Sequence, residues 1–164
     1  MFQYRRINVN KDRDRLLEFH CRINYESETT YARKVPYEEY RQKWFSTTQP
    51  ETYLSDLSKS MRNKRTIAEI LEDNGTPIAY LWVTFADIQG YDMTIAEIMD
   101  IIVTPEHQRR GIGLSMLTHI EKIAKERGAT FLRSDTGIEN VASEKLHEKF
   151  GFRIKRIEYE KILR

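Results

Sequence analysis

The residues best suited to chemistry lie between residues 101 and 114, where an apolar run gives way to a basic turn that contains glycine. Backbone N–H groups at the start of a helix have no partner within that helix and carry the positive end of its dipole, so they favour an anion. Gly111 and Gly113 lack a Cβ and let a ligand approach the main chain, while Arg109 and Arg110 add positive charge. The segment predicts a site for a pyrophosphate-sized anion. The alternative is a helix start with packing glycines and a solvated turn.

Two common nucleotide-binding motifs do not account for this turn. A P-loop needs Gly-x4-Gly-Lys-Ser/Thr, and the chain contains no such string. A dinucleotide fingerprint needs a third glycine where this chain has Met116.

No metal site is expected from the residue types that usually form one. Four histidines, at positions 20, 107, 119 and 147, are dispersed without metal-ligand spacing. Cys21 is the only cysteine, which excludes an internal disulfide and a multi-cysteine zinc site. Because Cys21 follows Leu17 by four residues in an amphipathic stretch, we expect a buried helix thiol and not a nucleophile.

Apolar periodicity predicts the elements that position these residues. In the first half we expect a strand, three helices and a loop before the second helix: strand Phe2–Val9, helix Lys11–Tyr25, loop Ser27–Val35, and helices beginning at Pro36 and Pro50. The second half reads as a strand hairpin followed by alternating strands and helices: strands Thr66–Glu72, Ile78–Ala86 and Thr94–Val103, helix Gly111–Arg127, strand Thr130–Thr136, helix Asn140–Phe150 and a last strand Phe152–Ile162. This order predicts an α/β or α+β domain whose mixed, mostly antiparallel central sheet is flanked by helices.

Length and charge narrow the class of protein. A chain of 164 residues predicts one domain spanning 1–164. Its 27 Lys and Arg nearly balance 25 Asp and Glu, whereas a generic nucleic-acid binder would show a clear basic excess. No run approaches the roughly 18 apolar residues of a membrane span, and no apolar segment follows Arg5-Arg6 as an export signal would require. We therefore expect a cytoplasmic protein that binds neither nucleic acid nor membrane.

Two blocks of sequence resemble one known family. Gln108 to Gly113 is similar to the acyl-CoA pyrophosphate loop of the GNAT superfamily of N-acetyltransferases, written Gln/Arg-x-x-Gly-x-Gly/Ala, and Val103-x-Pro105 resembles the strand exit before it. Asn140 to Phe152 (NVASEKLHEKFGF) is similar to the family's downstream helix. In motif order, the resemblance covers about residues 66 to 160. It implies an acetyltransferase that uses acetyl-CoA.

The resemblance also assigns cofactor-binding roles. The backbone amides of the loop would hold the CoA pyrophosphate, and these residues are Gln108, Arg109, Arg110, Gly111, Ile112 and Gly113. Val103 would pair its main chain with the pantetheine arm, and the Asn140 side chain would steady that arm. An ordinary helix N-cap is the alternative for Asn140.

Transfer to an amine requires a proton acceptor, because a lysine-like amine is almost fully protonated at pH 7. Glu97 lies fourteen residues before Gly111, a spacing that resembles the base-bearing strand of the histone-acetylating members. The alternative is a solvated or paired strand residue. Asp100 is the second acid, and regular alternation would place it on the opposite face from Glu97.

The family usually protonates the thiolate with a tyrosine of the downstream helix, where this chain has His147. Imidazole can donate a proton, so His147 is a candidate acid. The alternative is a structural histidine between Leu146 and Phe150.

The resemblance places the amine acceptor beside the first helices. Glu26 and Glu28, with Tyr37, Tyr40 and Trp44 beyond them, could suit a cationic amine. Loop solvation and core packing are the alternative for these residues. The acceptor would be a small-molecule or peptide amine, and a homodimer is possible by resemblance. The competing functions are a non-catalytic acyl-CoA-binding regulatory domain and a nucleic-acid module that uses residues 153–156.

Overall fold

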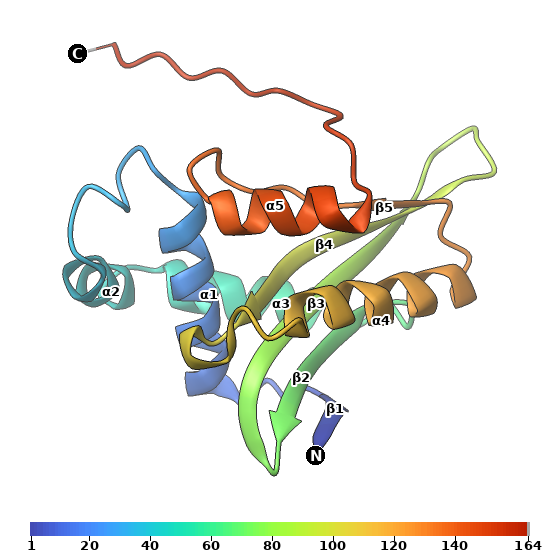
Figure 1. The fold of residues 1–164 in the computed structure, drawn as a ribbon, viewed down its shortest axis with the longest axis horizontal. Coiled ribbons are helices and arrows are strands. Elements are labelled where there is room, and N and C mark those ends of the chain that lie inside the picture. The colour runs from blue at the N-terminus through green and yellow to red at the C-terminus, as the bar shows by residue number, and fades with distance from the viewer. Residues whose placement is uncertain (164) are drawn as a thin grey trace.

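The computed structural model describes residues 1–163, and its centre is a five-stranded sheet (Figure 1). The strands lie side by side in chain order: β1 (Phe2–Arg6), β2 (Ile67–Asp73), β3 (Thr76–Asp87), β4 (Thr94–Val103) and β5 (Phe131–Arg133). The pairs β1–β2, β2–β3 and β3–β4 are antiparallel, and β4–β5 is parallel. The predicted mixed, mostly antiparallel sheet is confirmed.

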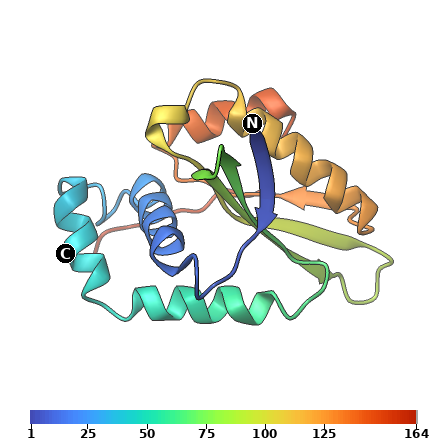
Figure 2. The ribbon, with the colours of Figure 1, turned by 90° about the horizontal axis from the view of Figure 1, so that it is seen from below.

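Helices cover both faces of this sheet. They are α1 (Arg13–Ser27), α2 (Tyr37–Phe45), α3 (Gln49–Ser60), α4 (Ile112–Glu126) and α5 (Val141–Phe150), with a short 3₁₀ helix η1 (Pro105–His107) between β4 and α4. Seen from below, α4 and α5 lie on one side of the sheet, while α1 and α3 lie on the other (Figure 2). α4 connects β4 to its parallel neighbour β5, because parallel strands need a crossover connection and not a hairpin.

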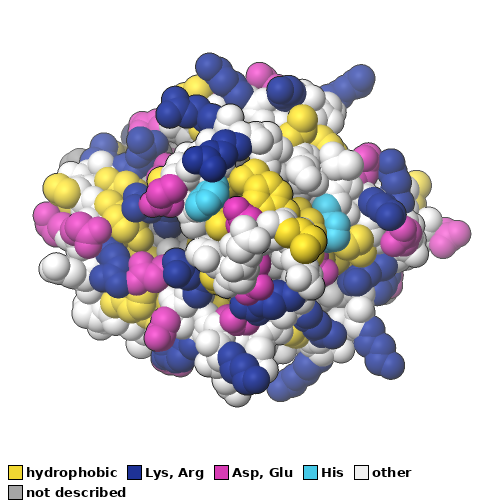
Figure 3. Space-filling model, turned by 60° about the horizontal axis from the view of Figure 1, so that its bottom comes forward, with side chains coloured by type: hydrophobic (Ala, Val, Ile, Leu, Met, Phe, Trp, Pro, Cys, Tyr) yellow, Lys and Arg dark blue, Asp and Glu magenta, His cyan; other side chains and the backbone are white. Residues whose placement is uncertain are grey.

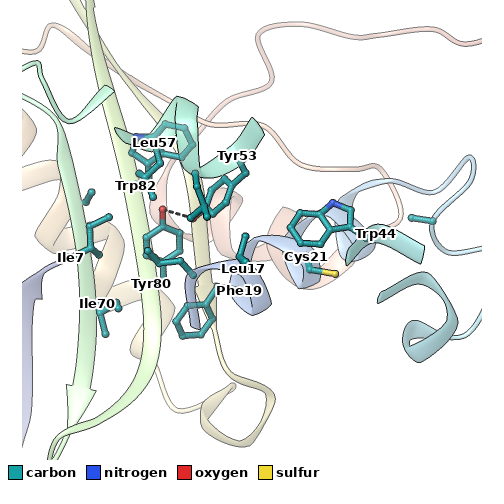
Figure 4. Packing of buried hydrophobic residues seen from close by; sticks show 14 of the residues in the cluster. Ile7, Leu17, Phe19, Cys21, Trp44, Tyr53, Leu57, Ile70, Tyr80 and Trp82 are labelled. Carbon is teal, nitrogen blue, oxygen red and sulfur yellow. Dashed lines mark hydrogen bonds between the residues drawn. The ribbon is translucent and has the colours of Figure 1, made fainter. Parts of the chain in front are cut away.

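Strand β3 is buried on both faces because it separates two hydrophobic clusters. Tyr80 and Trp82 pack with α1, α2 and α3, whereas Leu81 and Val83 pack with α4. Figure 4 shows the first cluster, in which the Tyr53 hydroxyl of α3 donates to the Tyr80 hydroxyl at 2.9 Å. Alternation along one strand therefore supplies the cores of both layers.

The hairpin between β2 and β3 follows the turn chemistry of its sequence. Asn74 and Gly75 both have positive φ, 49° and 81°, as the two central residues of a type I′ turn require. The turn signal at residues 73–75 is confirmed.

Cys21 is fully buried in α1, and this burial raises the pKa of its thiol to about 11, which agrees with the expected core thiol.

Two expectations about the last third of the chain are wrong. The region Phe152–Ile162 forms no strand. Phe152 is half-buried against the core, and the residues after it run as an extended, exposed segment across the molecule (Figure 1). The strand expected over Thr130–Thr136 is shorter, because β5 ends at Arg133 where its pairing with β4 ends. Across residues 1–163, no helix combines the length and apolar character needed to cross a bilayer.

Candidate active site

The open edge of β4 is the feature around which the site is built. β5 pairs with β4 only from Ile95 to Glu97, so the rest of β4 has no strand on that side within the described residues. Thr104 N donates to Ile78 O on the other side at 2.8 Å. Since main-chain groups alternate in direction along a strand, those of Val103 face the open edge. An extended ligand can therefore pair with β4 as an added strand would.

A β-bulge in β4 changes which side chains share a face. Trp82 lies opposite Asp100 and Thr84 lies opposite Glu97, with a register shift between them that leaves Met99 as the extra residue. Directly opposed residues share a face, and Trp82 and Thr84 lie two residues apart on β3. Glu97 and Asp100 consequently lie on the same face of the sheet. The expectation of opposite faces is wrong, because it assumed regular alternation.

At the end of β4 the backbone forms a turn suited to an anion. Gly111 has φ 79°, and Arg109 has φ 59°, a conformation that is uncommon for a residue other than glycine. Where left-handed and right-handed backbone conformations alternate, successive N–H groups point toward one concave side. The hydrogen bonds of α4 begin with Ser115 N donating to Gly111 O at 3.1 Å, so the N–H groups of residues 112–114 precede the helical ladder. The turn therefore combines unpaired N–H donors with a backbone that converges them.

Two contacts fix this turn to its surroundings. Gln108 Nε2 donates to Val103 O at 3.0 Å, which folds the turn back on the end of β4. A Cβ on Gly113 would lie 3.1 Å from Leu146 of α5. Gly113 therefore also permits α4 and α5 to approach closely, a packing role in addition to the ligand access expected from its sequence. Arg110 lines a small pocket with Phe2 and other residues of β1 and β2.

The surface on the underside of the molecule carries charges of both signs. In Figure 3, Lys and Arg side chains alternate with Asp and Glu side chains over this face, and a hydrophobic patch near its centre has a histidine on each side. Local fields on this face therefore come from individual charged groups, and not from one broad basic surface.

Two predicted residues lie on or beside α5. Asn140 Oδ1 accepts from Ser143 N at 3.2 Å, which confirms the N-cap alternative. His147 Nδ1 lies 2.7 Å from Ser143 O, and a carbonyl can only accept, so Nδ1 carries the proton. His147 Nε2 is buried and has no partner within residues 1–163. In this neutral tautomer Nε2 is an acceptor, and the ring packs edge-on against Phe152 at 5.0 Å.

Glu97 is exposed at the point where β4 and β5 separate. Asp100, on the other side of the bulge, is 3% exposed and accepts a hydrogen bond from His20 of α1 over 2.8 Å. Burial raises the pKa of Asp100, and the hydrogen bond from His20 opposes that rise. No local sequence pattern gave His20 a role, because its partner is eighty residues away.

The residues expected beside the acceptor divide into two groups. Tyr40 and Trp44 are 8% and 5% exposed and belong to the core, so they do not form a surface for a cationic amine. Glu28 accepts from Thr30 N at 2.9 Å, and Glu26 lies 3.9 Å from Arg22. These two carboxylates, at the end of α1 and the start of the following loop, therefore have local partners, and the core-packing alternative is correct for the two aromatic residues.

Gly137 lies where the segment after β5 meets the end of α1. A Cβ on Gly137 would lie 2.0 Å from Ser27 O, so the segment after β5 contacts the end of α1 directly. Arg33 Nη1 also donates to Glu139 O at 3.2 Å. These contacts join the α1–α2 loop to the segment before α5.

Among the described residues, no three His, Cys, Asp or Glu side chains are grouped to hold a metal ion.

Comparison with known proteins identifies the family. The model of the acetyltransferase (GNAT) family matches residues 25–152. The chain belongs to the GNAT family. An uncharacterized N-acetyltransferase of Methanocaldococcus jannaschii is 28% identical over 93 residues, which are 54% of this chain and 39% of that protein. The chain thus spans about two fifths of this relative's length.

Solved structures show the same GNAT fold over nearly the whole chain. A GCN5-related N-acetyltransferase from Ralstonia eutropha JMP134 superposes with a TM-score of 0.74 at 15% identity, covering 99% of both chains. A predicted acetyltransferase from Clostridium acetobutylicum, solved with acetyl-CoA, gives a TM-score of 0.67 at 20% identity over 99% of this chain and 97% of that one. The resemblance seen in the sequence and the GNAT fold class are both confirmed.

Proposed function

We propose that this chain transfers an acetyl group from acetyl-CoA directly to a primary amine. The observation that carries the proposal is the open edge of β4, which leads from an anion-binding turn to a β-bulge. The chemistry of this path, an anion-binding turn followed by free main-chain groups, suits a pyrophosphate joined to an amide-containing arm. The thioester would lie at the bulge beside Met99, where the sheet presents Glu97 and Asp100 on one face.

The acetyl-CoA contacts follow from the turn and the strand. The main chain from Gln108 to Gly113 (Gln108, Arg109, Arg110, Gly111, Ile112, Gly113) would bind the pyrophosphate. Val103 would pair with the pantetheine arm through main-chain groups that face the open edge, and Asn140 would border the arm while it caps α5. Acetyl-CoA is a co-substrate in this reaction, which requires no metal.

Proton transfer needs two groups in this reaction. The amine arrives as an ammonium and must lose a proton before its nitrogen attacks the thioester carbon. Glu97 is the candidate base, directly or through water, because it is exposed on the face that the amine approaches. His147 is the candidate acid for the CoA thiolate, and it must first bind a proton at Nε2, since its neutral form carries the proton on Nδ1.

The test is a screen of amines with acetyl-CoA that measures release of free thiol. We expect turnover with at least one class of polyamine, aminoglycoside, amino acid or peptide amine. Glu97→Gln should lower kcat about 100-fold and leave acetyl-CoA binding unchanged, since general-base catalysis contributes roughly 100- to 10,000-fold. Glu121→Gln, which alters an exposed carboxylate on α4, is the matched control.

Different results separate the alternatives. Near-normal activity of Glu97→Gln excludes Glu97 as the main base. Tight binding of acetyl-CoA without turnover on any amine would instead support a non-catalytic acyl-CoA-binding domain. Unchanged turnover in both His147→Ala and His147→Tyr would exclude the acid role of His147.

We also propose a homodimer that uses the segment from residue 152 to 163. This segment is extended and exposes apolar side chains interspersed with charged ones, the apolar ones being Ile154, Ile157, Tyr159, Ile162 and Leu163. Its attachment to the rest of the chain includes Thr30 Oγ1 donating to Glu160 Oε1 at 2.5 Å. An extended segment of this pattern is suited to pair with a strand or surface of a second copy. Light scattering should show a dimer for the native chain and a monomer for Ile157→Lys with Tyr159→Lys.

A further inference from the structure

A histidine–carboxylate pair lies beside the bulge of β4, outside the residues assigned to the reaction so far. Asp100 follows the extra residue Met99, and its carboxylate accepts from His20 Nδ1 at 2.8 Å. The side chains of Asp100 and His20 are 2% and 19% exposed, so the carboxylate is enclosed and the imidazole reaches the surface. α1 brings His20 to the face of the sheet that also carries Glu97.

The ring of His20 is held on more than one side. It stacks on Tyr53 of α3 with a centroid distance of 3.8 Å and an interplanar angle of 13°, and it lies 6.2 Å from the ring of Trp44. Tyr53 is fixed in turn by its hydrogen bond to Tyr80, and Figure 4 shows these two tyrosines meeting in the core. A stacked and hydrogen-bonded imidazole has little freedom to rotate, as a group that must receive a proton at one atom requires.

The hydrogen bond also decides which nitrogen is free. While Asp100 is ionised, its carboxylate only accepts, so Nδ1 carries the proton and Nε2 holds the lone pair. Within residues 1–163 no hydrogen bond engages His20 Nε2, and the partly exposed ring leaves this atom open to solvent. A carboxylate that orients an imidazole in this tautomer is the arrangement that makes histidine a base in hydrolase triads.

The stoichiometry of amide formation leaves a task for such a group. The ammonium loses one proton before attack, and the nitrogen loses a second when the N–C bond forms and the C–S bond breaks. The departing thiolate ends as a thiol by taking up one proton, so one proton in each turnover is released to solvent. An acceptor that is separate from Glu97 lets the second proton leave the nitrogen as the bond forms.

We infer that His20 is a second proton acceptor for the attacking amine, through Nε2, and that Asp100 is its positioning residue. The inference rests on the proposed acetyl transfer and adds a residue to it. Directly or through one water, the proton of the attacking nitrogen passes to Nε2 and then to solvent, while the thiolate leaves with the electron pair of the C–S bond. The charged or titratable groups around the ring are Asp100 from β4, with Tyr53 from α3 and Tyr80 from β3 behind it.

The chain contains a matched control for this inference. His119 of α4 pairs with Glu69 of β2 at 2.7 Å and stacks on Tyr4 at 3.8 Å, on the opposite face of the sheet. With the amine found in the screen, His20→Gln should lower kcat about 100-fold, and His119→Gln should leave kcat within about 3-fold. The KM for acetyl-CoA should change by less than about 3-fold in both. Added imidazole should restore part of the activity of His20→Ala and none to Glu97→Gln.

Each result bears on a different claim. Equal kcat values for His20→Gln and His119→Gln would overturn the role of His20 while the wild-type turnover supports acetyl transfer. Absence of turnover in the wild type would overturn the proposed function and this inference with it. On the wild-type protein, ¹⁵N NMR of the imidazoles should show the proton of neutral His20 on Nδ1. A proton on Nε2 would contradict the inference without any substitution.

Discussion

Two histidine–carboxylate pairs on opposite faces of the sheet have the same contacts and different settings. His20 with Asp100 and His119 with Glu69 each include a tyrosine stacked on the imidazole at 3.8 Å. The Asp100 side chain is 2% exposed and adjoins the bulge of β4, whereas that of Glu69 is 20% exposed and lies on β2, away from the open edge. The chemistry of a pair is therefore set by its position in the sheet as much as by its residue types.

The difference in burial gives the two pairs different energetic roles. A buried carboxylate needs its hydrogen-bond donor, because an uncompensated charge away from water is unfavourable. Asp100 has this donor in His20, so the fold depends on the pair even without a substrate. Glu69 is half-buried and still reaches water, so we expect its pair to contribute less to stability than the pair of the enclosed Asp100.

Removing each carboxylate should show the largest contrast in stability. Asp100→Ala should lower the free energy of unfolding by about 3 kcal/mol, since it leaves the His20 donor unpaired and a small cavity in the core. Glu69→Ala should lower it by about 1 kcal/mol or less. Urea denaturation of both variants measures the difference. Equal losses would show that the two settings do not differ energetically.

The stacked tyrosines provide a finer comparison. Tyr53→Phe removes the donor to the buried Tyr80 hydroxyl, and the free energy of unfolding should fall by about 1.5 kcal/mol. Tyr4→Phe removes a buried hydroxyl that has no partner within residues 1–163, so we expect a change of about zero or a slight gain. Thermal unfolding followed by circular dichroism would measure both. A larger loss for Tyr4→Phe would contradict the assignment of the Tyr4 hydroxyl as unpaired.

The Asp12 carboxylate, which pairs with Arg5, should make the stability of the fold depend on pH, and this ion pair provides a reference for the two histidine–carboxylate pairs. The hydrogen bonds from Arg5 lower the pKa of Asp12 in the folded protein below its ordinary value of 3.8. At pH values between the folded and the unfolded pKa of Asp12, the unfolded chain binds more protons than the folded protein, so stability rises with pH. The contribution of Asp12 is complete above about pH 4 and is lost as the pH falls through the folded value.

Asp12→Asn should therefore lower stability by about 1 kcal/mol at pH 7, discounted because the pair is partly exposed. The difference between Asp12→Asn and wild type should stay constant above about pH 4 and shrink as the pH falls below that value. Urea denaturation at several pH values measures it. A difference that grows toward low pH would contradict the direction of the pKa shift.

Local features of the fold were predictable from the sequence. The Asn74-Gly75 turn, the proline in the first turn of α3 and the glycine turn before α4 depend on residues that are neighbours in the chain. The glycines and free N–H groups at the start of α4 were predictable for the same reason, since they lie within one short segment, whereas the positive φ of Arg109 was not predicted.

The remaining features depend on contacts between distant residues. The bulge at Met99 comes from the register of β4 against β3, which no local pattern specifies. The His20–Asp100 pair joins segments eighty residues apart. The segment after Phe152 carries apolar residues interspersed with charged ones, yet a strand also needs a partner, and a local apolar pattern does not provide one. The close approach of Gly113 to Leu146 likewise required the placement of α5.

The most direct test is the single-turnover rate of amine acetylation in Asp100→Asn, with Glu69→Gln as the matched control. Asparagine keeps the shape of Asp100 and can hold His20 in the wrong tautomer, which removes the lone pair at Nε2. We predict that the rate falls about 100-fold in Asp100→Asn and changes less than about 3-fold in Glu69→Gln, with acetyl-CoA bound equally by both variants. Equal rates in the two variants would contradict the account.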